Sequence, residues 1–327
     1  MAQAATAAWL PDAAHLFARF TPIDRRNAGG APLTHSLADS YAYCRKVAKQ
    51  SGSNFVMSFM LLPRPKSQAM YALYAFMRQT DDLGDQPGDL LEKQTALKQW
   101  RHDLHAALAG ETPSDPRLPA LVDTIRRNEI PVEYLTAVID GVERDLTPQP
   151  FPTFAESQHY CYQVAAAVGL ACLHVWGFQG EAAIPPALAC GYAFQWTNIL
   201  RDLHEDALAG RLYLPQDEMT RFDVSIDDFA TSRATDGFRE LMQFQIQRAE
   251  QFYDQAEPLQ SLLHADGRKI FPAMFCTYRG LLARIEQDPT AVLRQRVSVG
   301  SWKKMRIVTS LMLAQLFDFS TPTTVSR

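Results

Sequence analysis

The sequence predicts an all-α protein that folds as one domain. Its 327 residues are 47% hydrophobic and 21% charged, which is sufficient for a sizeable core and too apolar for a disordered chain. Ala, Leu, Gln, Glu and Arg dominate the long segments, and β-branched residues rarely alternate with polar ones, so the helical period prevails almost throughout. No low-complexity linker, composition step or fixed short period divides the sequence.

The individual helices are expected between clusters of Pro and Gly, which interrupt the helical pattern. In chain order, these breaks fall at Pro63 and Pro65, Pro87-Gly88, Pro113 and Pro116, Pro148 to Pro152, Gly177 to Gly180 with Pro185-Pro186, and Pro289. The expected helices cover residues 35–50, 65–84, 89–108, 131–145, 153–176, 185–208, 233–264 and 269–287. Because every gap is short, we expect one helical domain over residues 35–318, with loose ends at residues 1–34 and 319–327.

Charge and cysteine usage narrow the class of partner and the compartment. Lys and Arg total 32 against 36 Asp and Glu, so the net charge of −4 gives no general attraction to nucleic acid or anionic lipid. No nucleic-acid partner is therefore expected, while the oligomeric state is not readable from the sequence. The cysteines are odd in number, scattered and without CxxC spacing, as is typical of thiols in a reducing cytoplasm: Cys44, Cys161, Cys172, Cys190 and Cys276.

No stretch of the sequence predicts export or a membrane span. The N-terminus lacks a basic leader, and no window approaches the ~18 to 20 apolar residues that a spanning helix requires. We therefore expect a cytoplasmic protein. The run Lys303-Lys304-Met-Arg306 precedes an apolar stretch, for which peripheral membrane association through an amphipathic helix is an alternative to ordinary packing.

Two acidic clusters follow apolar helical runs and share one internal spacing. The first contains Asp81 and Asp85, and the second contains Asp202 and Asp206. Side chains four residues apart lie over one another on a helix, so each pair presents two carboxylates to one side. Asn198 adds a neutral oxygen one turn before Asp202.

Such like-charged pairs require a cation to offset their repulsion. Oxygen ligands without Cys or paired His suit Mg²⁺, with Mn²⁺ as an alternative, and Mg²⁺ commonly bridges protein carboxylates to substrate phosphates. Two facing clusters would therefore hold a Mg²⁺-diphosphate. A solvated acidic surface is the alternative for one cluster alone, and a di-iron site would need two Glu-x-x-His units, whereas only Glu156-Ser-Gln-His159 occurs.

At these residues the sequence resembles the squalene/phytoene synthase family of head-to-head prenyl transferases. The resemblance extends from about Tyr41 to about Arg306. Its most specific part is Asn198-Ile-Leu-Arg-Asp-Leu-His-Glu-Asp206 followed by Gly210-Arg-Leu-Tyr-Leu-Pro215. The other matching stretches are residues 51–63, 72–85 and 160–169.

The resemblance implies an isoprenoid-synthase helical bundle with a central cavity, in which paired aspartates bind Mg²⁺ and two allylic isoprenoid diphosphates. The implied metal ligands, with two supporting residues, are Asp81, Asp85, Asp202 and Asp206, then Asn198 and Glu205. The implied diphosphate contacts are Arg78, Arg201 and Arg211 and, on a looser match, Tyr278, Lys303 and Lys304. Arg78 and Arg201 would also assist catalysis, together with Tyr160, which matches a family tyrosine linked to proton handling.

The length of the product has one indicator in the sequence. Phe55 and Phe59 lie four residues apart, so both rings are expected in one wall of the substrate cavity. Family members that make C30 products resemble this bulky pair, which favours two farnesyl diphosphates as substrates and presqualene diphosphate or a C30 hydrocarbon as product. Phytoene synthase, which condenses two geranylgeranyl diphosphates, is the enzymatic alternative. A helical carrier of polyprenyl lipids is the non-enzymatic one.

Two features of the reaction stay open at this point. The proton acceptor is either Tyr160 or the departing diphosphate. The sequence has no G-x-G-x-x-G nucleotide loop, but family members that use NADPH have no such domain either, so its use is undecided.

Overall fold

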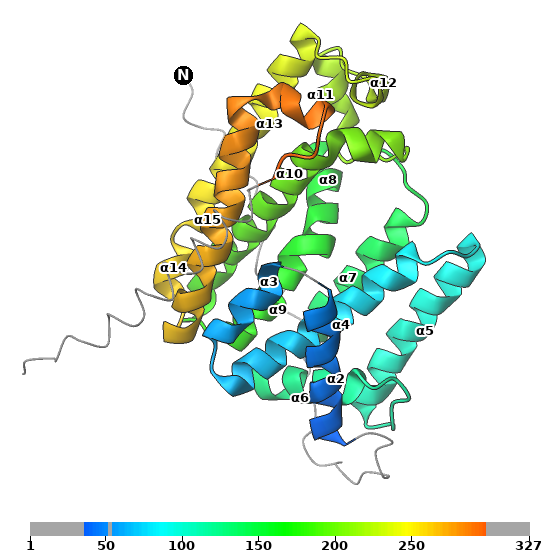
Figure 1. Cartoon of the computed structure of the whole chain (residues 1–327), viewed down its shortest axis with the longest axis vertical. Coiled ribbons are helices and arrows are strands. Elements are labelled where there is room, and N and C mark those ends of the chain that lie inside the picture. Colours follow the sequence, from blue (N-terminus) through cyan, green and yellow to red (C-terminus); the bar gives the residue numbers. More distant parts are fainter. Residues whose placement is uncertain (1–35, 52–53, 299–327) are drawn as a thin grey trace, which may run out of the picture.

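The computed structural model describes residues 36–51 and 54–298, apart from the side chains of residues 54 and 55. Within these ranges the chain forms helices and no β-strand, which confirms the all-α expectation (Figure 1). The expected loose ends and the last part of the expected domain, from residue 299, lie outside the described residues. The same holds for the side chain of Phe55 and for Lys303 and Lys304.

Most of the long helices lie where the sequence predicts them. In chain order the elements are α2 (Leu37–Gln50), α3 (Asn54–Ser58), η1 (Phe59–Leu61), α4 (Arg64–Asp85), α5 (Leu90–Ala109), α6 (Leu118–Asn128), α7 (Val132–Asp145), α8 (Phe154–Cys161), η2 (Tyr162–Ala166), α9 (Ala167–Trp176), η3 (Glu181–Ala183), α10 (Ile184–Leu208), α11 (Gln216–Arg221), α12 (Ile226–Ala230), α13 (Asp236–Ala256), α14 (Leu259–Leu262), α15 (Ala265–Gln287) and η4 (Pro289–Leu293). Helix α6 was not predicted. Its Pro119 lies in the first turn and does not interrupt the helix, because the first backbone N–H groups lack helical partners anyway.

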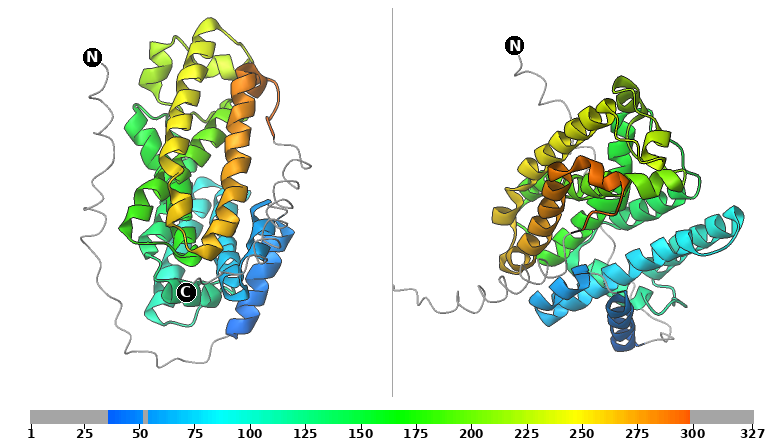
Figure 2. Two further views of the ribbon diagram at one scale, coloured as in Figure 1. Left: turned by 90° about the vertical axis from the view of Figure 1, so that its left-hand side faces the viewer. Right: turned by 45° about the horizontal axis from the view of Figure 1, so that its top comes forward.

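Two long helices organise the bundle. Around α4 pack α2, α5, α6 and α7, whereas α10 packs against α12, α13 and α15. The segment of α9 and η2 contacts both α7 and α10 and so lies between the two groups. In the right-hand view of Figure 2, the N-terminal helices and the C-terminal helices accordingly form two separate sides of the molecule.

The α9 segment approaches α10 closely at one irregular turn. The expected helix 153–176 contains a π-helical turn, η2, between α8 and α9. Gly191 of α10 faces this turn, and a Cβ there would lie 2.3 Å from the Cα of Ala166. Only glycine permits this approach, because any side chain would overlap the neighbouring backbone. Inserted π-turns are frequent at functional sites.

A buried polar network fixes α10 in the region where its functional residues begin. Gln245 of α13 is fully buried and accepts a hydrogen bond from the Trp196 indole at 3.2 Å. The Gln245 amide donates to Glu218 at 2.7 Å, and Glu218 pairs with Arg248 at 2.5 Å. Every member has a partner, as a buried polar cluster requires. The network therefore ties α10 to α11 and α13.

None of the described helices combines the length and the hydropathy needed to cross a bilayer.

Candidate active site

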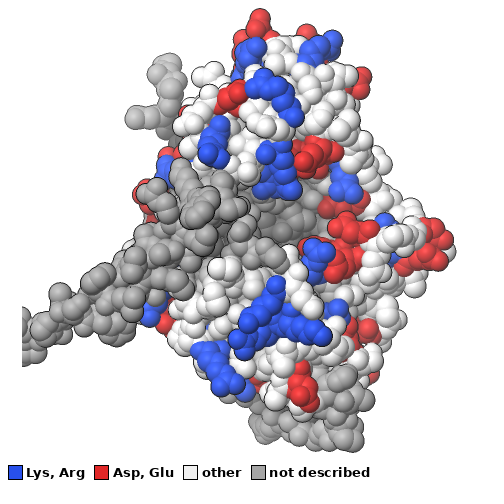
Figure 3. Space-filling model, in the orientation of Figure 1, with Lys and Arg blue, Asp and Glu red and all other residues white. Residues whose placement is uncertain are grey.

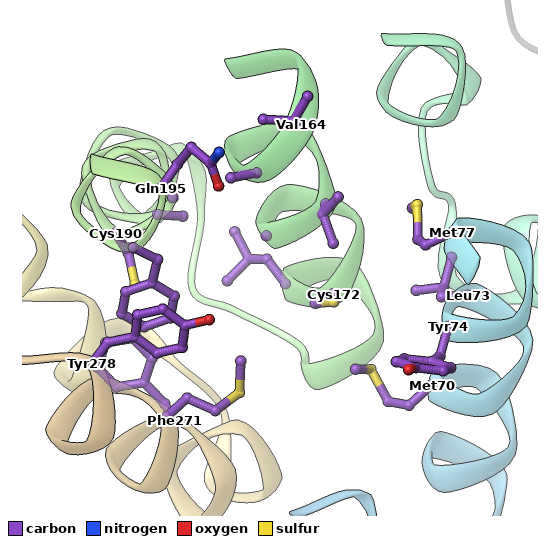
Figure 4. A pocket seen from close by; sticks show the side chains of 18 of the residues that line it. Met70, Leu73, Tyr74, Met77, Val164, Cys172, Cys190, Gln195, Phe271 and Tyr278 are labelled. Atoms are coloured by element: carbon purple, nitrogen blue, oxygen red, sulfur yellow. The ribbon is translucent and has the colours of Figure 1, made fainter. Parts of the chain in front are cut away.

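An apolar cavity of about 300 Å³ lies between the two sides of the bundle. Figure 4 shows Met70, Leu73, Tyr74 and Met77 of α4 on one side and the side chains of α10 and α15, such as Tyr278, on the other. Two polar residues from the predicted clusters, Asp81 and Asn198, line the same cavity. Helices α4 and α10 therefore each contribute one of these residues, a carboxylate and an amide, to the same chamber.

Asp81 is the member of the α4 cluster that faces the cavity. Asp81 is exposed by its accessible surface, yet protein atoms crowd around its carboxylate at the cavity and partly desolvate it. Burial first, and then the negative charge of Asp85, raise the pKa of Asp81 to about 6. Arg78 pairs with Asp82 at 2.7 Å rather than with Asp81, so the Asp81 carboxylate forms no ion pair with any described residue.

The α10 cluster already contains protein cations. Asp202 accepts a hydrogen bond from Arg201 Nε at 2.7 Å and another from Arg296 Nε at 3.0 Å. Glu205 is more exposed and lies 3.8 Å from Arg296. Asp206 forms no ion pair with any described residue, and burial together with the charge of Asp202 raises the pKa of Asp206 to about 7.

Asn198 supplies an oxygen without a partner at the wall of the cavity. Its Oδ1 is buried and accepts no hydrogen bond from the residues that the structure describes. The amide lies beside Tyr278, whose ring stacks on Phe194 with centroids 4.3 Å apart. A buried acceptor of this kind normally has a partner, so a cation or ligand donor is expected there.

Asp145 is a functional candidate that the sequence analysis missed. It ends α7 and adds its negative charge to both Asp81 and Asp206, so it lies near both clusters. Burial raises the pKa of Asp145. The only local signal is that the expected helix 131–145 ends in an acidic residue, without the four-residue pairing that marks the two recognised clusters.

Tyr160 forms a hydrogen bond with Asp145 and is not among the residues that line the cavity. Its hydroxyl donates to Asp145 at 2.8 Å, and Tyr213 donates to the other carboxylate oxygen at 3.1 Å. The two rings stack with centroids 5.0 Å apart. Burial and the charge of Asp145 raise the pKa of Tyr160 above its ordinary value, so this hydroxyl is a donor at neutral pH. Arg211 lies beside these three residues, and its positive charge partly offsets the increase that burial causes in the pKa of Asp145.

The structure brings together most of the predicted site residues within its described part. Phe59 lines the cavity and packs edge-on against Tyr71 and Tyr74, with centroids 5.6 and 6.3 Å away. This agrees with the expectation that its ring lies in the cavity wall. Arg296, like Asp145, was not predicted, because nothing in its local sequence connects it to Asp202, 94 positions earlier.

The donor set suits a hard divalent cation. Carboxylates with raised pKa values and an unpartnered amide oxygen are short of positive charge, and all are oxygen ligands. No three carboxylate, His or Cys side chains of the described residues already converge on one point. Mg²⁺ keeps several waters and takes further ligands from substrate phosphates.

An all-α bundle in which α4 and α10 carry paired aspartates near their C-terminal ends, beside an apolar cavity, is the arrangement of helical prenyl transferases. Comparison with known proteins identifies the family, because the squalene/phytoene synthase profile matches residues 48–303. The chain belongs to this family. It is therefore a prenyltransferase of the head-to-head type. Enzymes of this family bind allylic isoprenoid diphosphates and use a divalent metal such as Mg²⁺.

Relatives of known name include two cyanobacterial proteins. A phytoene synthase of Arthrospira platensis is 38% identical over 87% of this chain and 94% of its own length. A 15-cis-phytoene synthase of Synechococcus elongatus is 36% identical over 83% of this chain and 91% of its own.

Solved structures agree with this assignment at lower identity. A dehydrosqualene synthase in complex with ligand superposes with a TM-score of 0.75 and 27% identity, covering 86% of this chain and 98% of its own. A squalene synthase, HpnC of Alicyclobacillus acidocaldarius, has a TM-score of 0.72 and 28% identity over 77% of this chain and 94% of its own.

Proposed function

We propose that this chain is a phytoene synthase, which condenses two geranylgeranyl diphosphates head to head. The observation that carries this proposal is the 38% identity to a phytoene synthase over 94% of that protein's length. The C30 enzymes among the solved structures are 27% and 28% identical. These comparisons favour the phytoene synthase alternative over the farnesyl diphosphate preference that Phe55 and Phe59 indicated.

The two acidic clusters would hold the diphosphates through Mg²⁺ or Mn²⁺. The proposed ligands are Asp81, Asp85, Asp202 and Asp206, together with the free oxygen of Asn198. The metal, when bound, would neutralise negative charge on the departing diphosphate. The arginines would bind the remaining diphosphate oxygens: Arg78, Arg201 and Arg211.

The cavity would protect the allylic cation that remains after diphosphate departs. Its walls are apolar and partly aromatic, so water is kept away from a species that water would trap. The ring faces of Phe194 and Tyr278, stacked at the wall, would stabilise the cation electrostatically. The double bond of the second substrate would then attack, and loss of a proton would close a cyclopropane ring.

Asp145 is the protein group best suited to influence that proton. Tyr160 keeps its own proton because its pKa is raised, and it donates it in a hydrogen bond to Asp145. We propose that Tyr160 and Tyr213 orient the Asp145 carboxylate, and that this carboxylate assists the departing diphosphate in accepting protons. Formation of phytoene loses protons and gains no hydride, so this proposal includes no NADPH.

Product analysis tests the proposed function directly. The enzyme would be incubated with Mg²⁺ and either geranylgeranyl or farnesyl diphosphate, with and without NADPH, and the products identified by mass spectrometry. We expect a C40 hydrocarbon from geranylgeranyl diphosphate without NADPH. A C30 product alone would indicate that farnesyl diphosphate is the substrate. Failure to release diphosphate from either substrate would favour a lipid carrier.

A further inference from the structure

The stretch from Ser40 to Thr80 has an unusual charge composition. It contains six Lys and Arg residues and no Asp or Glu, although the whole chain has a net charge of −4. The overall charge therefore conceals a strongly positive region. In the structure this stretch forms α2, α3, η1 and most of α4.

Four of the six basic side chains are exposed and form no ion pair with any other described residue. Lys66 pairs with Asp266, and Arg78 pairs with Asp82. The other four form no ion pair within the part of the chain that the structure describes: Arg45, Lys46, Lys49 and Arg64. Figure 3 shows Lys and Arg gathered over α2 and the beginning of α4. Their charge is available to a partner.

Two exposed methionines lie between these basic groups in the chain. Met57 is 52% exposed and Met60 is 54% exposed, so two large apolar side chains reach solvent within four residues. Phe59, between them in sequence, is only 3% exposed and lines the cavity. The segment of α3 and η1 is thus a thin wall, with thioethers on its outer side and the substrate chamber on its inner side.

This surface is remote from the acidic end of the cavity. Arg64 begins α4 and Asp81 lies near its end, so they are roughly 25 Å apart along the helix axis. Arg64 is therefore too far along α4 to serve the diphosphate site. Positive charge around exposed apolar side chains is the pattern of a surface that binds anionic lipid.

We propose that the basic methionine face, defined as Arg45, Lys46, Lys49, Met57, Met60 and Arg64, docks on an anionic lipid bilayer. The basic side chains would contact lipid phosphates, and the two methionines would enter the boundary between headgroups and acyl chains. A soluble polyanion would use the charges but would not need the methionines. If the proposed function holds, the wall formed by α3 and η1 also places the membrane beside the chamber in which the hydrocarbon product forms.

Vesicle sedimentation with the full chain tests this surface. The protein would be mixed with vesicles of phosphatidylcholine alone or of phosphatidylcholine with phosphatidylglycerol, and the bound fraction measured. We expect strong binding only to the anionic vesicles. Because each basic residue near such a surface contributes about fivefold, Lys46→Gln/Lys49→Gln should weaken binding by about 30-fold. Met57→Asn/Met60→Asn should weaken it by about tenfold or more.

Matched variants on α5 control for general effects of substitution. Lys93→Gln/Lys98→Gln removes two charges there, and Leu90→Asn/Leu91→Asn replaces side chains that are 44% and 71% exposed. Both should bind vesicles as the wild type does. Circular dichroism and activity in detergent would verify that every variant is folded.

Three results would overturn the proposal: no binding to anionic vesicles, equal binding to neutral vesicles, or equal loss in the face and control variants. A second pattern would assign the face to a soluble polyanion instead. In that pattern only the lysine variant loses vesicle binding, and the wild type binds heparin as tightly as it binds anionic vesicles. The product assay in detergent separates this question from the proposed function. Vesicle binding without a C40 product would leave the surface intact and remove the phytoene synthase assignment.

Discussion

The acidic clusters of α4 and α10 have the same spacing in sequence and different electrostatic surroundings in the structure. On α10, Asp202 is held by Arg201 and Arg296. On α4, Arg78 is paired with Asp82, and Asp81 has no ion-pair partner in the part of the chain that the structure describes. The difference indicates that Asp81 depends on a bound metal for its counter-charge, whereas Asp202 already has two arginine partners.

The largest expected effect comes from neutralising the unpaired carboxylates of the two clusters. Asp81→Asn and Asp206→Asn should each lower kcat by about 10² to 10³, because each removes a group that positions charge around the departing diphosphate. Release of inorganic diphosphate at saturating Mg²⁺ measures this. Asp82→Asn is the matched control on α4, since Asp82 is paired with Arg78. If it proved as damaging as Asp81→Asn, the contrast between these neighbours would be incorrect.

A somewhat smaller effect is expected at Asp145, which lies near both clusters. Asp145→Asn should lower kcat by about 10 to 100-fold, since it removes the charge that Tyr160 and Tyr213 orient. Tyr213→Phe, which removes one of the two hydrogen bonds, should cost less, about tenfold. Steady-state kinetics would measure both. Unchanged kcat in Asp145→Asn would mean that Asp145 has only a structural function.

The metal-free protein should lose stability as the pH rises towards neutrality. Burial and neighbouring carboxylates raise the folded-state pKa of Asp81 to about 6 and that of Asp206 to about 7, from an ordinary 3.8. A raised folded-state pKa contributes stability below the unfolded-state value, and this contribution is lost as the pH rises through the folded-state value. Tm should therefore fall between about pH 4 and about pH 7.

Comparison of variants isolates this contribution from those of other titrating groups. Asp81→Asn/Asp206→Asn should have a smaller decrease of Tm with pH than the wild type, whereas Asp82→Asn should follow the wild type. Added Mg²⁺ should raise the Tm of the wild type at neutral pH, because it binds the deprotonated carboxylates. Identical pH profiles for wild type and double variant would contradict the assigned pKa shifts.

The smallest effect concerns the additional arginine of the α10 cluster. Arg296 forms an ion pair with Asp202 and would compete with a metal for this carboxylate. Arg296→Gln should therefore let Mn²⁺ bind more tightly in the absence of substrate. We expect a gain of up to about fivefold, because the ion pair is half-exposed. Isothermal titration calorimetry would measure it. Arg294→Gln is the matched control, because Arg294 pairs with Asp288 outside the site. Weaker metal binding in Arg296→Gln would exclude this competition.

The sequence predicted those parts of the site that local helical spacing determines. Asp81, Asp85, Asp202 and Asp206 are visible because four-residue spacing puts both members of a pair on one side of a helix. The long helices were predictable for the same reason, since each has a continuous helical pattern between proline or glycine breaks. Short elements such as α3 and η1 are too brief to show a period.

The rest of the site depends on contacts between distant segments. Asp145 has no carboxylate four residues away, and its importance arises only when α7 brings it near α4 and α10. Arg296 reaches Asp202 across 94 positions. Phe59 is likewise a weak guide to the product length, because one ring in a cavity wall does not fix the depth of a chamber formed by several helices.

The central claim is that α4 and α10 bind Mg²⁺ and diphosphate together at the mouth of one cavity. Crystals grown with Mn²⁺ and a non-hydrolysable prenyl diphosphate analogue would test it, because anomalous scattering locates Mn²⁺ unambiguously. The account predicts manganese peaks beside the carboxylates of both helices, with the diphosphate between them and the prenyl chain in the cavity. Peaks confined to one helix or to the outer surface, with the analogue elsewhere, would contradict it.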